Sequence, residues 1–492
     1  MSFKETLEPI FNRLPAVAGP EGHVHFKNKM MWTLGILVLY FALANVPLFG
    51  LSADSIDLFE QYRAFFAGAS GSMMLLGIGP IVTASIVLQL LVGADVIKLD
   101  MSDPSDQAFF QGAQKFMVFV MIVLEALPQI VGGYIQPDVS VANALGVNIG
   151  VVTLLIFIQI CIGGILILFM DEIVSKWGIG SGVGLFIVAG VSQQIVTGLF
   201  NWKPDDAGLP IGILPKWFYI VQNVGADYLF SGEGISFMLI SGGILALVTT
   251  VVIFLMVVYV ESMRIEIPLA HSAVKGARGR FPVKLIYASV LPMILVRALQ
   301  ANLQMIGILL SGRGITILGE YQGSTPINGL MYYINPINSP YDWIPSLVRE
   351  SFASSGAPVP ATWQIGLHVF MDATFLIVGG IIFALFWIET TGMGAKPTAQ
   401  KVFNSGMQIP GFRRNVGSIE KVMIRYIPKV TIIGGAFIGA LTLVASMLGT
   451  LGGAGGTGLL LTVSIVYRLY EDIASEQMME MHPMVRSLFG QE

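Results

Sequence analysis

Basic residues are concentrated in two segments that separate long apolar runs, and they could bind a negatively charged partner. Twelve of the 27 Lys and Arg residues lie in residues 261–284 and 389–429. A bilayer core cannot hold such segments, so both must lie in water, and the positive-inside rule places them in the cytoplasm. The residues alone leave open whether they attract anionic lipid or an acidic macromolecule. The twelve are Arg264, Lys275, Arg278, Arg280, Lys284, Lys396, Lys401, Arg413, Arg414, Lys421, Arg425 and Lys429.

The residue types that usually perform catalysis or bind metals are scattered along the chain. The five histidines have no metal-ligand spacing beyond His23 and His25, and the single cysteine, Cys161, lies in an apolar run. The glycine clusters lie within or between apolar runs rather than after a strand, so they do not form a P-loop. We therefore expect no enzymatic activity, no cofactor and no metal.

A few polar side chains lie inside the apolar runs. Glu125 lies in one run, and Arg297 lies in another that also carries Asn302. A charge at this depth costs at least about 2.5–3.5 kcal/mol on insertion scales. The helices that carry these charges should therefore face protein or water rather than lipid. Asp372 and His368 lie near the outer end of their run, and we expect them to reach the interface.

The elements that position these residues are membrane-spanning helices. The 492 residues are 54% hydrophobic and only 12% charged, whereas soluble domains average about 25% charged residues. Apolar runs of about 20 residues match the hydrocarbon core of a bilayer. The sequence thus predicts an all-α polytopic membrane protein with ten spans, near 31–49, 73–93, 115–133, 150–170, 180–199, 236–260, 285–311, 364–388, 430–449 and 455–470.

The distribution of basic residues predicts the orientation. An even number of spans places both termini on one side, and that side carries 21 basic residues against five on the other. The positive-inside rule therefore makes both termini cytoplasmic. Residues 1–30 are polar, without a cleavable signal, and residues 2–14 resemble an amphipathic surface helix. Five spans precede the outer loop at 200–235 and five follow it, which suggests two inverted halves.

One segment does not fit a simple span. Residues 55–67 are apolar on one helical face, charged on the other, and too short to cross a bilayer. Composition leaves two interpretations open. The segment is either an interfacial helix on the outer face or a half-helix that re-enters a water-filled cavity.

Several long motifs resemble those of the SecY family over nearly the whole chain. They are GIGPIVTASIVLQLLVG at 77–93, GIGSGVGLFI at 178–187, RIEIPLAH at 264–271, KGARGRFPVKLIY, SGMQIPGFRRN at 405–415 and GTGLLLTVSIVYRLYE. The resemblance is to the archaeal form, which is similar to the eukaryotic endoplasmic-reticulum counterpart. It implies the central pore-forming subunit of the general protein secretion translocase. Such a subunit passes unfolded polypeptides across the membrane and releases hydrophobic segments sideways into lipid.

The resemblance implies two pseudo-symmetric halves around a central hourglass pore. The N-terminal half would comprise 31–199, the hinge loop 200–235 and the C-terminal half 236–470, followed by a cytoplasmic tail at 471–492. The narrowest part of the pore would be a ring of aliphatic side chains, which resists wetting and ion flow. By position in the motifs, the ring residues are Ile78, Val82, Val183, Ile187, Ile294 and Leu461.

The resemblance also implies a plug and a lateral gate. The half-helix near 55–67 would be the plug, with Leu58, Phe59, Tyr62, Phe65 and Phe66 on its apolar face. Lateral exit would open between the second and seventh spans. Thr83, Glu125 and Asn302 match the family's polar cluster there, where interhelical hydrogen bonds hold the gate shut. Arg297 departs from the neutral residue expected at its position, and we expect it to pair with Glu125 or to reach water.

The resemblance assigns partners to the two basic segments. They would receive the ribosome, with Arg278, Arg280, Arg413 and Arg414 as contact residues. Signal sequences and nascent polypeptides would be the transported partners, and membrane lipid would surround the channel. No small-molecule substrate is expected. A small SecE-type clamp subunit and a single-span third subunit of the SecG or beta type would complete the channel in the cell membrane.

An inverted-repeat secondary transporter is the alternative function. It predicts paired ionisable residues at mid-membrane for ion coupling, and only Glu125 and Arg297 are clear candidates. A transporter also leaves the two large basic segments unexplained, whereas a protein-conducting channel accounts for both.

Overall fold

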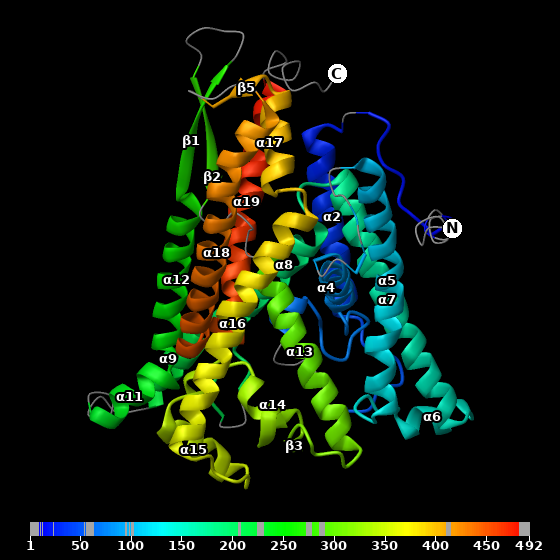
Figure 1. Ribbon diagram of the computed structural model, residues 1–492. Helices are drawn as coiled ribbons and strands as arrows, with labels where there is room; N and C mark the ends of the chain where they lie inside the picture. Colours follow the sequence, from blue (N-terminus) through cyan, green and yellow to red (C-terminus); the bar gives the residue numbers. More distant parts are fainter. Residues whose placement is uncertain are drawn as a thin grey trace.

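The computed structural model describes residues 9, 11, 13–22, 24–53, 55, 63–93, 96–97, 99, 103–204, 208–223, 231–271, 278–284, 291–409 and 415–481. Long helices dominate this part of the chain and run roughly side by side (Figure 1). The first-half helices are α2 (Phe26–Ala44), α3 (Arg63–Phe66), α4 (Gly79–Gly93), α5 (Pro104–Val131), α6 (Val139–Leu145), α7 (Ile149–Trp177) and α8 (Gly182–Phe200).

The remaining elements follow a connecting region that contains α9 (Ile213–Asn223) and α11 (Gly232–Ile240). The second-half helices are α12 (Ile244–Ser262), α13 (Leu291–Gly312), α14 (Gly329–Ile334), α15 (Pro345–Ser354), α16 (Thr362–Thr390), α17 (Ala395–Asn404), α18 (Val416–Leu448) and α19 (Gly455–Met481). The strands are β1 (Arg264–His271), β2 (Arg278–Lys284), β3 (Tyr321–Gln322), β4 (Thr325–Pro326) and β5 (Met407–Gln408), and short 3-10 turns cover Pro340–Asp342 and Leu451–Gly453.

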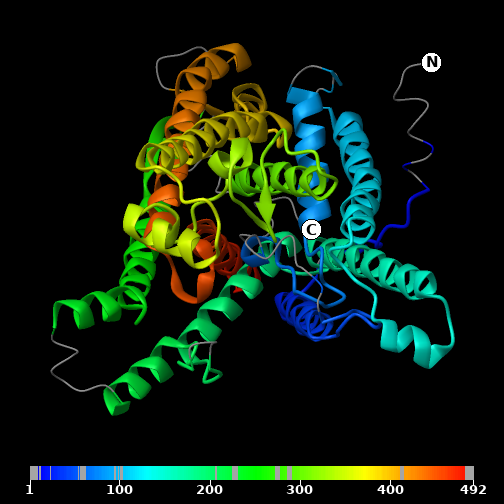
Figure 2. The ribbon, with the colours of Figure 1, turned by 90° about the horizontal axis from the view of Figure 1, so that it is seen from below.

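Each of the ten predicted spans corresponds to a helix: α2, α4, α5, α7, α8, α12, α13, α16, α18 and α19. In the described part of the chain, seven of them are long and apolar enough to cross a membrane. The other three differ for visible reasons. Helix α4 has only 15 residues, α2 begins with Lys27 and Lys29, and α19 ends in a charged stretch. The chain is thus a multi-pass helical membrane protein, with the first-half helices largely to one side of the second-half helices (Figure 2).

The second span is shorter than expected because the backbone preceding α4 is irregular. We predicted a span from residue 73, but the helix begins at Gly79. Gly77 has a φ of +57°, which only glycine adopts without strain. Pro80 lacks an amide hydrogen and fits the first turn of a helix. Residues 73–78 therefore form a turn that lies inside the helix bundle.

The first basic segment is a β-hairpin rather than an irregular loop between two spans. Strands β1 and β2 pair in antiparallel register from Arg264 opposite Lys284 to Ala270 opposite Arg278. The sequence signal of a strand is the alternation of charged and apolar residues at the start of β1, which places Ile265 and Ile267 on one face. Of these two, Ile267 is buried and Ile265 is exposed, so that face is covered only from Ile267 onward. The hairpin projects from one end of the molecule, while α14, α15 and β3 lie at the other (Figure 1).

Strand β5 adds to the free edge of β1, so the three-stranded sheet has the order β2-β1-β5. Ala270 lies opposite Gln408 in this register. The sheet therefore joins the first basic segment to the second. At its base, the buried side chains of Ile267 and Val283 belong to a core cluster that includes residues of α16, α17 and α18.

Candidate functional site

The six aliphatic residues expected to form the ring all belong to, or pack against, the large hydrophobic cluster that extends through the bundle. Ile78 precedes α4, and Val82 lies in its first turn; the others come from α8, α13 and α19. Five have exposed fractions of 0–4%, and Val183 is partly buried against the same cluster. Helices α4, α8, α13 and α19 thus contribute aliphatic side chains to one buried apolar cluster that includes residues of both halves.

Two side chains hold the start of α8, which carries Val183 and Ile187. Asp171 near the end of α7 accepts a hydrogen bond from the Val183 backbone nitrogen at 2.8 Å. Ser181 caps the same helix by accepting one from the Gly184 nitrogen at 3.2 Å. A cap of this kind contributes about 0.5–2 kcal/mol. The α8 side chains in this cluster are therefore positioned by a fixed helix end.

The described end of the proposed plug lies against this constriction. Phe66 and Ala67 are buried, and α3 packs against α8 and α19. The Phe66 carbonyl accepts a hydrogen bond from the Ile78 nitrogen at 2.7 Å, and the Tyr40 hydroxyl donates one to the Ala67 carbonyl at 2.9 Å. The described end of 55–67 thus lies within the bundle rather than at its surface. This favours a re-entering half-helix over an interfacial helix.

The other expected plug residues give less information. Leu58, Phe59 and Tyr62 lie outside the described residues, and only the backbone of Phe65 is described. Arg63 belongs to the described end, and its guanidinium donates to the Leu75 carbonyl. This contact ties the charged face of the segment to the turn preceding α4.

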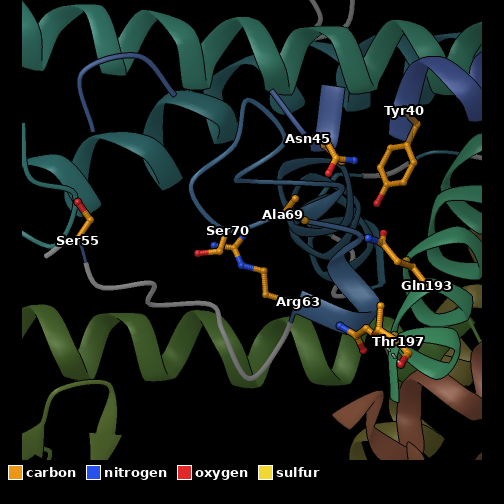
Figure 3. Close-up of a pocket in the computed structure, with 12 residues that line it drawn as sticks. Tyr40, Asn45, Ser55, Arg63, Ala69, Ser70, Gln193 and Thr197 are labelled. Carbon is orange, nitrogen blue, oxygen red and sulfur yellow. Dashed lines mark hydrogen bonds between the residues drawn. The ribbon is translucent and has the colours of Figure 1, made fainter. Parts of the chain in front are cut away.

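A polar cavity of about 530 Å³ lies beside the plug segment (Figure 3). Tyr40, Asn45, Arg63, Gln193 and Thr197 are among the side chains that line it. We did not predict the α8 contribution, although the polar stretch of Gln193, Gln194 and Thr197 within an apolar span was a readable signal. The cavity places polar side chains of α2 and α8 beside the described end of the plug segment.

The three residues expected at the lateral gate form one connected cluster. The Asn302 amide of α13 donates a hydrogen bond to the Thr83 hydroxyl of α4 at 3.2 Å. The Thr83 hydroxyl also interacts with the Glu125 carboxyl of α5. Glu125 is buried, and the other two are partly buried. This cluster spans the seam, by which we mean the contact of α4 and α5 with α13.

Arg297 does not pair with Glu125, and it does not reach water, so both expectations for it were wrong. It is 2% exposed, and its guanidinium lies 3.4 Å from the Asp372 carboxylate of α16. It also donates to the Gln300 side chain at 2.7 Å and to the Thr457 hydroxyl at 3.0 Å. Because these partners sit on α13, α16 and α19, the network lies entirely within the second half.

Asp372 and His368 also differ from the expectation that they reach the interface. Asp372 is 0% exposed and His368 is 2% exposed. The Gln300 amide donates to Asp372 at 3.0 Å, and the His368 imidazole is hydrogen-bonded to the Asn335 carbonyl at 2.8 Å. The loop between α13 and α16 (residues 313–361), called the outer loop from here on, folds back over the end of α16 and supplies the partner of His368. Hydropathy alone does not reveal this contact.

The basic residues expected to bind the ribosome are only partly described. Arg278 and Arg280 lie in β2, opposite Ala270 and Pro268, and only their backbones are described. Arg413 and Arg414 lie outside the described residues. The hairpin is anchored at its base by an ion pair of 2.6 Å between Lys284 and Glu471 of α19.

Ten helices that share a buried apolar cluster, with a re-entering segment packed against it and a hydrogen-bonded seam beside it, have the arrangement expected of a membrane channel. The sequence profile of the SecY family matches residues 72–470, and the profile named the plug domain of Sec61p matches residues 38–71. The chain belongs to the SecY family.

Curated relatives and solved structures agree with this assignment. The chain is 59% identical to the protein translocase subunit SecY of Archaeoglobus fulgidus over 99% of this chain and 98% of the relative. It is 55% identical to that of Halobacterium salinarum over 100% of this chain and 99% of the relative. A solved protein-conducting channel is 38% identical with a TM-score of 0.77, covering 97% of this chain and 98% of that one. Sec61 in the canine ribosome-channel complex is 38% identical with a TM-score of 0.74, over 97% of this chain and 98% of that one.

These findings favour a channel over a secondary transporter. The transporter interpretation predicted paired ionisable residues at mid-membrane, with Glu125 and Arg297 as the candidates. These two do not pair with each other, and Arg297 is paired with Asp372 inside the second half. The relatives and solved structures are translocase subunits and protein-conducting channels.

Proposed function

We propose that this chain forms the pore of a protein translocase, passes unfolded polypeptides through the central constriction, and releases hydrophobic segments into lipid through the seam. The observation that carries the proposal is the meeting of six aliphatic side chains from four helices in one cluster. An apolar constriction resists wetting and therefore blocks ions. Its side chains make no directional bonds, so they fit around a passing chain of any sequence.

Crosslinking tests the proposal directly. Cysteines at Val82 and Ile294, in a Cys161→Ser background, should crosslink to a nascent chain held on a ribosome by a stalled signal-bearing message. Both positions contribute to the constriction, and they come from different halves. Ribosome binding without crosslinks at either position would mean that the chain docks ribosomes but does not conduct the polypeptide. The absence of both ribosome binding and crosslinks would reject the proposal altogether.

The seam would open because a signal sequence gains free energy in lipid. About ten Leu-like residues gain roughly 3–6 kcal/mol on insertion scales. Interhelical hydrogen bonds such as that between Asn302 and Thr83 contribute about 0.6–2 kcal/mol each. A hydrophobic segment therefore gains more by entering lipid than a few such bonds oppose, and it shifts the gate toward its open state.

Replacing Asn302 with Leu should relax the discrimination between signal sequences. The change removes the hydrogen bond to Thr83, and a loss of about 0.6–2 kcal/mol corresponds to about a three- to thirtyfold shift toward the open gate. Export of substrates with weak signals would then rise, measured as the translocated fraction in cells or vesicles. Thr83→Ser keeps the hydroxyl and serves as the matched control. Unchanged export of weak-signal substrates by the Asn302 variant would contradict the gate assignment.

We propose that the two basic segments receive the ribosome, with Arg278, Arg280, Arg413 and Arg414 as contacts. Support comes from the sheet that brings both segments together and from the similarity to Sec61 in a ribosome-channel complex. Phosphate contacts bind by releasing counterions, so affinity should fall steeply with salt. Other proposed partners are a SecE-type clamp subunit and a SecG- or beta-type third subunit.

Charge reversal at Arg413 should weaken ribosome binding and reduce its salt dependence. Loss of one phosphate contact lowers the slope of log affinity against log salt by about 1. The measurement is the affinity of the reconstituted channel for ribosomes at several salt concentrations. Lys203→Glu makes the same charge change in the loop at 200–235, which lies on the opposite side of the membrane in the proposed orientation. This variant should leave the affinity unchanged. An unaffected, salt-independent affinity of the Arg413→Glu variant would reject the docking role.

We propose that the chain lies in the cell membrane with both termini and the β1–β2 hairpin on the cytoplasmic side. The asymmetry of 21 basic residues against five supports this orientation. The domain limits follow from it: a cytoplasmic N-terminus at 1–30, halves at 31–199 and 236–470 separated by the external hinge loop 200–235, and a tail at 471–492. Cytoplasmic projections at 261–284 and 389–429 complete the arrangement.

A further inference from the structure

A second hydrogen bond crosses the seam, away from the predicted polar cluster. Tyr134 lies just beyond the end of α5, and its hydroxyl donates to the Ile308 carbonyl of α13 at 3.1 Å. Ile308 lies six residues after Asn302, which is about 9 Å further along the helix. The two bonds therefore join the same two halves at different depths. The bond of Tyr134 lies nearer the end of the molecule that carries α14 and β3.

The helix ends on both sides of the seam leave room for the Tyr134 side chain. A Cβ atom at Gly132 would lie 2.7 Å from the Tyr134 ring, and one at Gly312 would lie 2.9 Å from its hydroxyl oxygen. Both distances are shorter than normal van der Waals contact, so a larger residue at either position would displace the ring. Glycines at 132 and 312 thus allow α5 and α13 to approach through this one tyrosine.

The stretch of α13 that Tyr134 contacts is fixed to the second half by a further tyrosine. The Tyr321 hydroxyl of β3 donates to the Gln304 side chain at 2.7 Å, and the Gln304 amide donates to the Met331 carbonyl at 2.8 Å. The outer loop and α13 are therefore tied together, so separating the halves breaks the Tyr134 bond rather than those of Tyr321.

The rest of the seam at this depth is not closely packed. A cavity of about 380 Å³ separates α5 from α13 beside Tyr134. Its apolar walls include Leu127 and Val131 on one side and Leu309 and Leu310 on the other. Where helices do not interdigitate, van der Waals attraction between them is reduced. The hydrogen bond of Tyr134 therefore provides a large share of what holds the two helix ends together here.

We propose that Tyr134 is a second latch of the lateral gate and sets, together with Asn302, the hydrophobicity that a segment needs for release into lipid. The inference rests on the proposed gate between α4 and α13. Tyr134 is a specificity-determining residue in this scheme. A segment must be apolar enough to offset both hydrogen bonds before the halves separate along their full depth.

The test uses Tyr134→Phe, which removes the hydroxyl but keeps the ring. The reconstituted channel with its partner subunits would be given a series of nascent segments with increasing leucine content, and the fraction released into lipid would be measured. Loss of the bond should shift the gate about three- to thirtyfold toward opening, so the threshold should fall by at least about one leucine. Asn302→Leu serves as the gate control and Tyr341→Phe as the tyrosine control, since Tyr341 is exposed on the outer loop.

A direct measurement of opening separates a latch from a general structural role. Cysteines at Leu127 and Leu309, in a Cys161→Ser background, lie on opposite walls of the cavity. Tyr134→Phe should slow their reaction with a short bifunctional maleimide, because the walls separate more often, without changing the melting temperature of the complex.

Three outcomes would overturn the proposal. An unchanged threshold for Tyr134→Phe with a lowered one for Asn302→Leu would remove Tyr134 from the gate and leave the gate intact. Unchanged thresholds for both variants would reject the gate and the latch together. An equal effect of Tyr341→Phe would show that the loss of any outer hydroxyl acts in the same way.

Discussion

Replacing Asp372 with Leu is expected to lower the free energy of unfolding by about 3–5 kcal/mol, because it leaves Arg297 as a buried charge without its partner. Arg297 and Asp372 are almost fully buried, and their side chains lie 3.4 Å apart. The Ile337 backbone nitrogen, which approaches the same carboxylate at 3.4 Å, would also lose an acceptor. The free energy of unfolding of the purified channel, measured by denaturant titration in detergent, gives the size of the change.

A double-mutant cycle shows whether the loss comes from the unpaired charge. Arg297→Met combined with Asp372→Leu removes both charges, and such replacements of buried ion pairs are often neutral or stabilising. The double variant should therefore recover most of the stability lost in Asp372→Leu. Thr374→Leu, at an exposed position of the same helix, controls for a leucine in α16. Equal stability of the single and double variants would mean that the pair is not coupled.

Replacing Gly77 with Ala is expected to make the resting channel leak ions. A Cβ atom at this position would overlap the Phe66 carbonyl oxygen and lie 2.8 Å from the Gly68 nitrogen, and the positive φ adds strain for any residue with a side chain. Overpacking of this kind costs about 1–3 kcal/mol. The population with the plug segment displaced from Ile78 should rise about 5- to 160-fold.

Conductance of the reconstituted channel in planar bilayers, without a translocating chain, measures this leak. Gly35→Ala is the matched control, because a Cβ atom at this position of α2 would meet no other atom within 4 Å. The control should show the low resting conductance of the unmodified chain. A Gly77→Ala channel that is as tight as the control would mean that the contact of Phe66 with Ile78 does not seal the pore.

Much of the architecture could be predicted from local sequence. Apolar runs of span length indicated the number and order of the helices, because each run must reach across the same thickness of hydrocarbon. The ring residues could not be predicted in this way. Ile78 and Leu461 look like any buried aliphatic residue in a span, and only the similarity of the motifs distinguished them.

The errors arose where long-range packing decides the partner. Asp372 lies 75 residues from Arg297, and its position near the end of an apolar run suggested exposure, whereas the outer loop folds over it. Helix α4 begins late because the segment around Gly77 bonds to Phe66 instead of continuing the helix. Tyr134 was overlooked because a tyrosine at the end of a span usually marks the membrane interface.

The sheet of β2, β1 and β5 has a consequence for the thermodynamics of docking. Its ladder pairs the backbones of two segments that are separated in the chain by α13, α16 and the outer loop. A partner that bound two independent loops would have to order each of them, and ordering opposes association. Here the paired backbone of both segments is already ordered before the partner arrives. The gain appears as a smaller entropic penalty rather than as additional contacts.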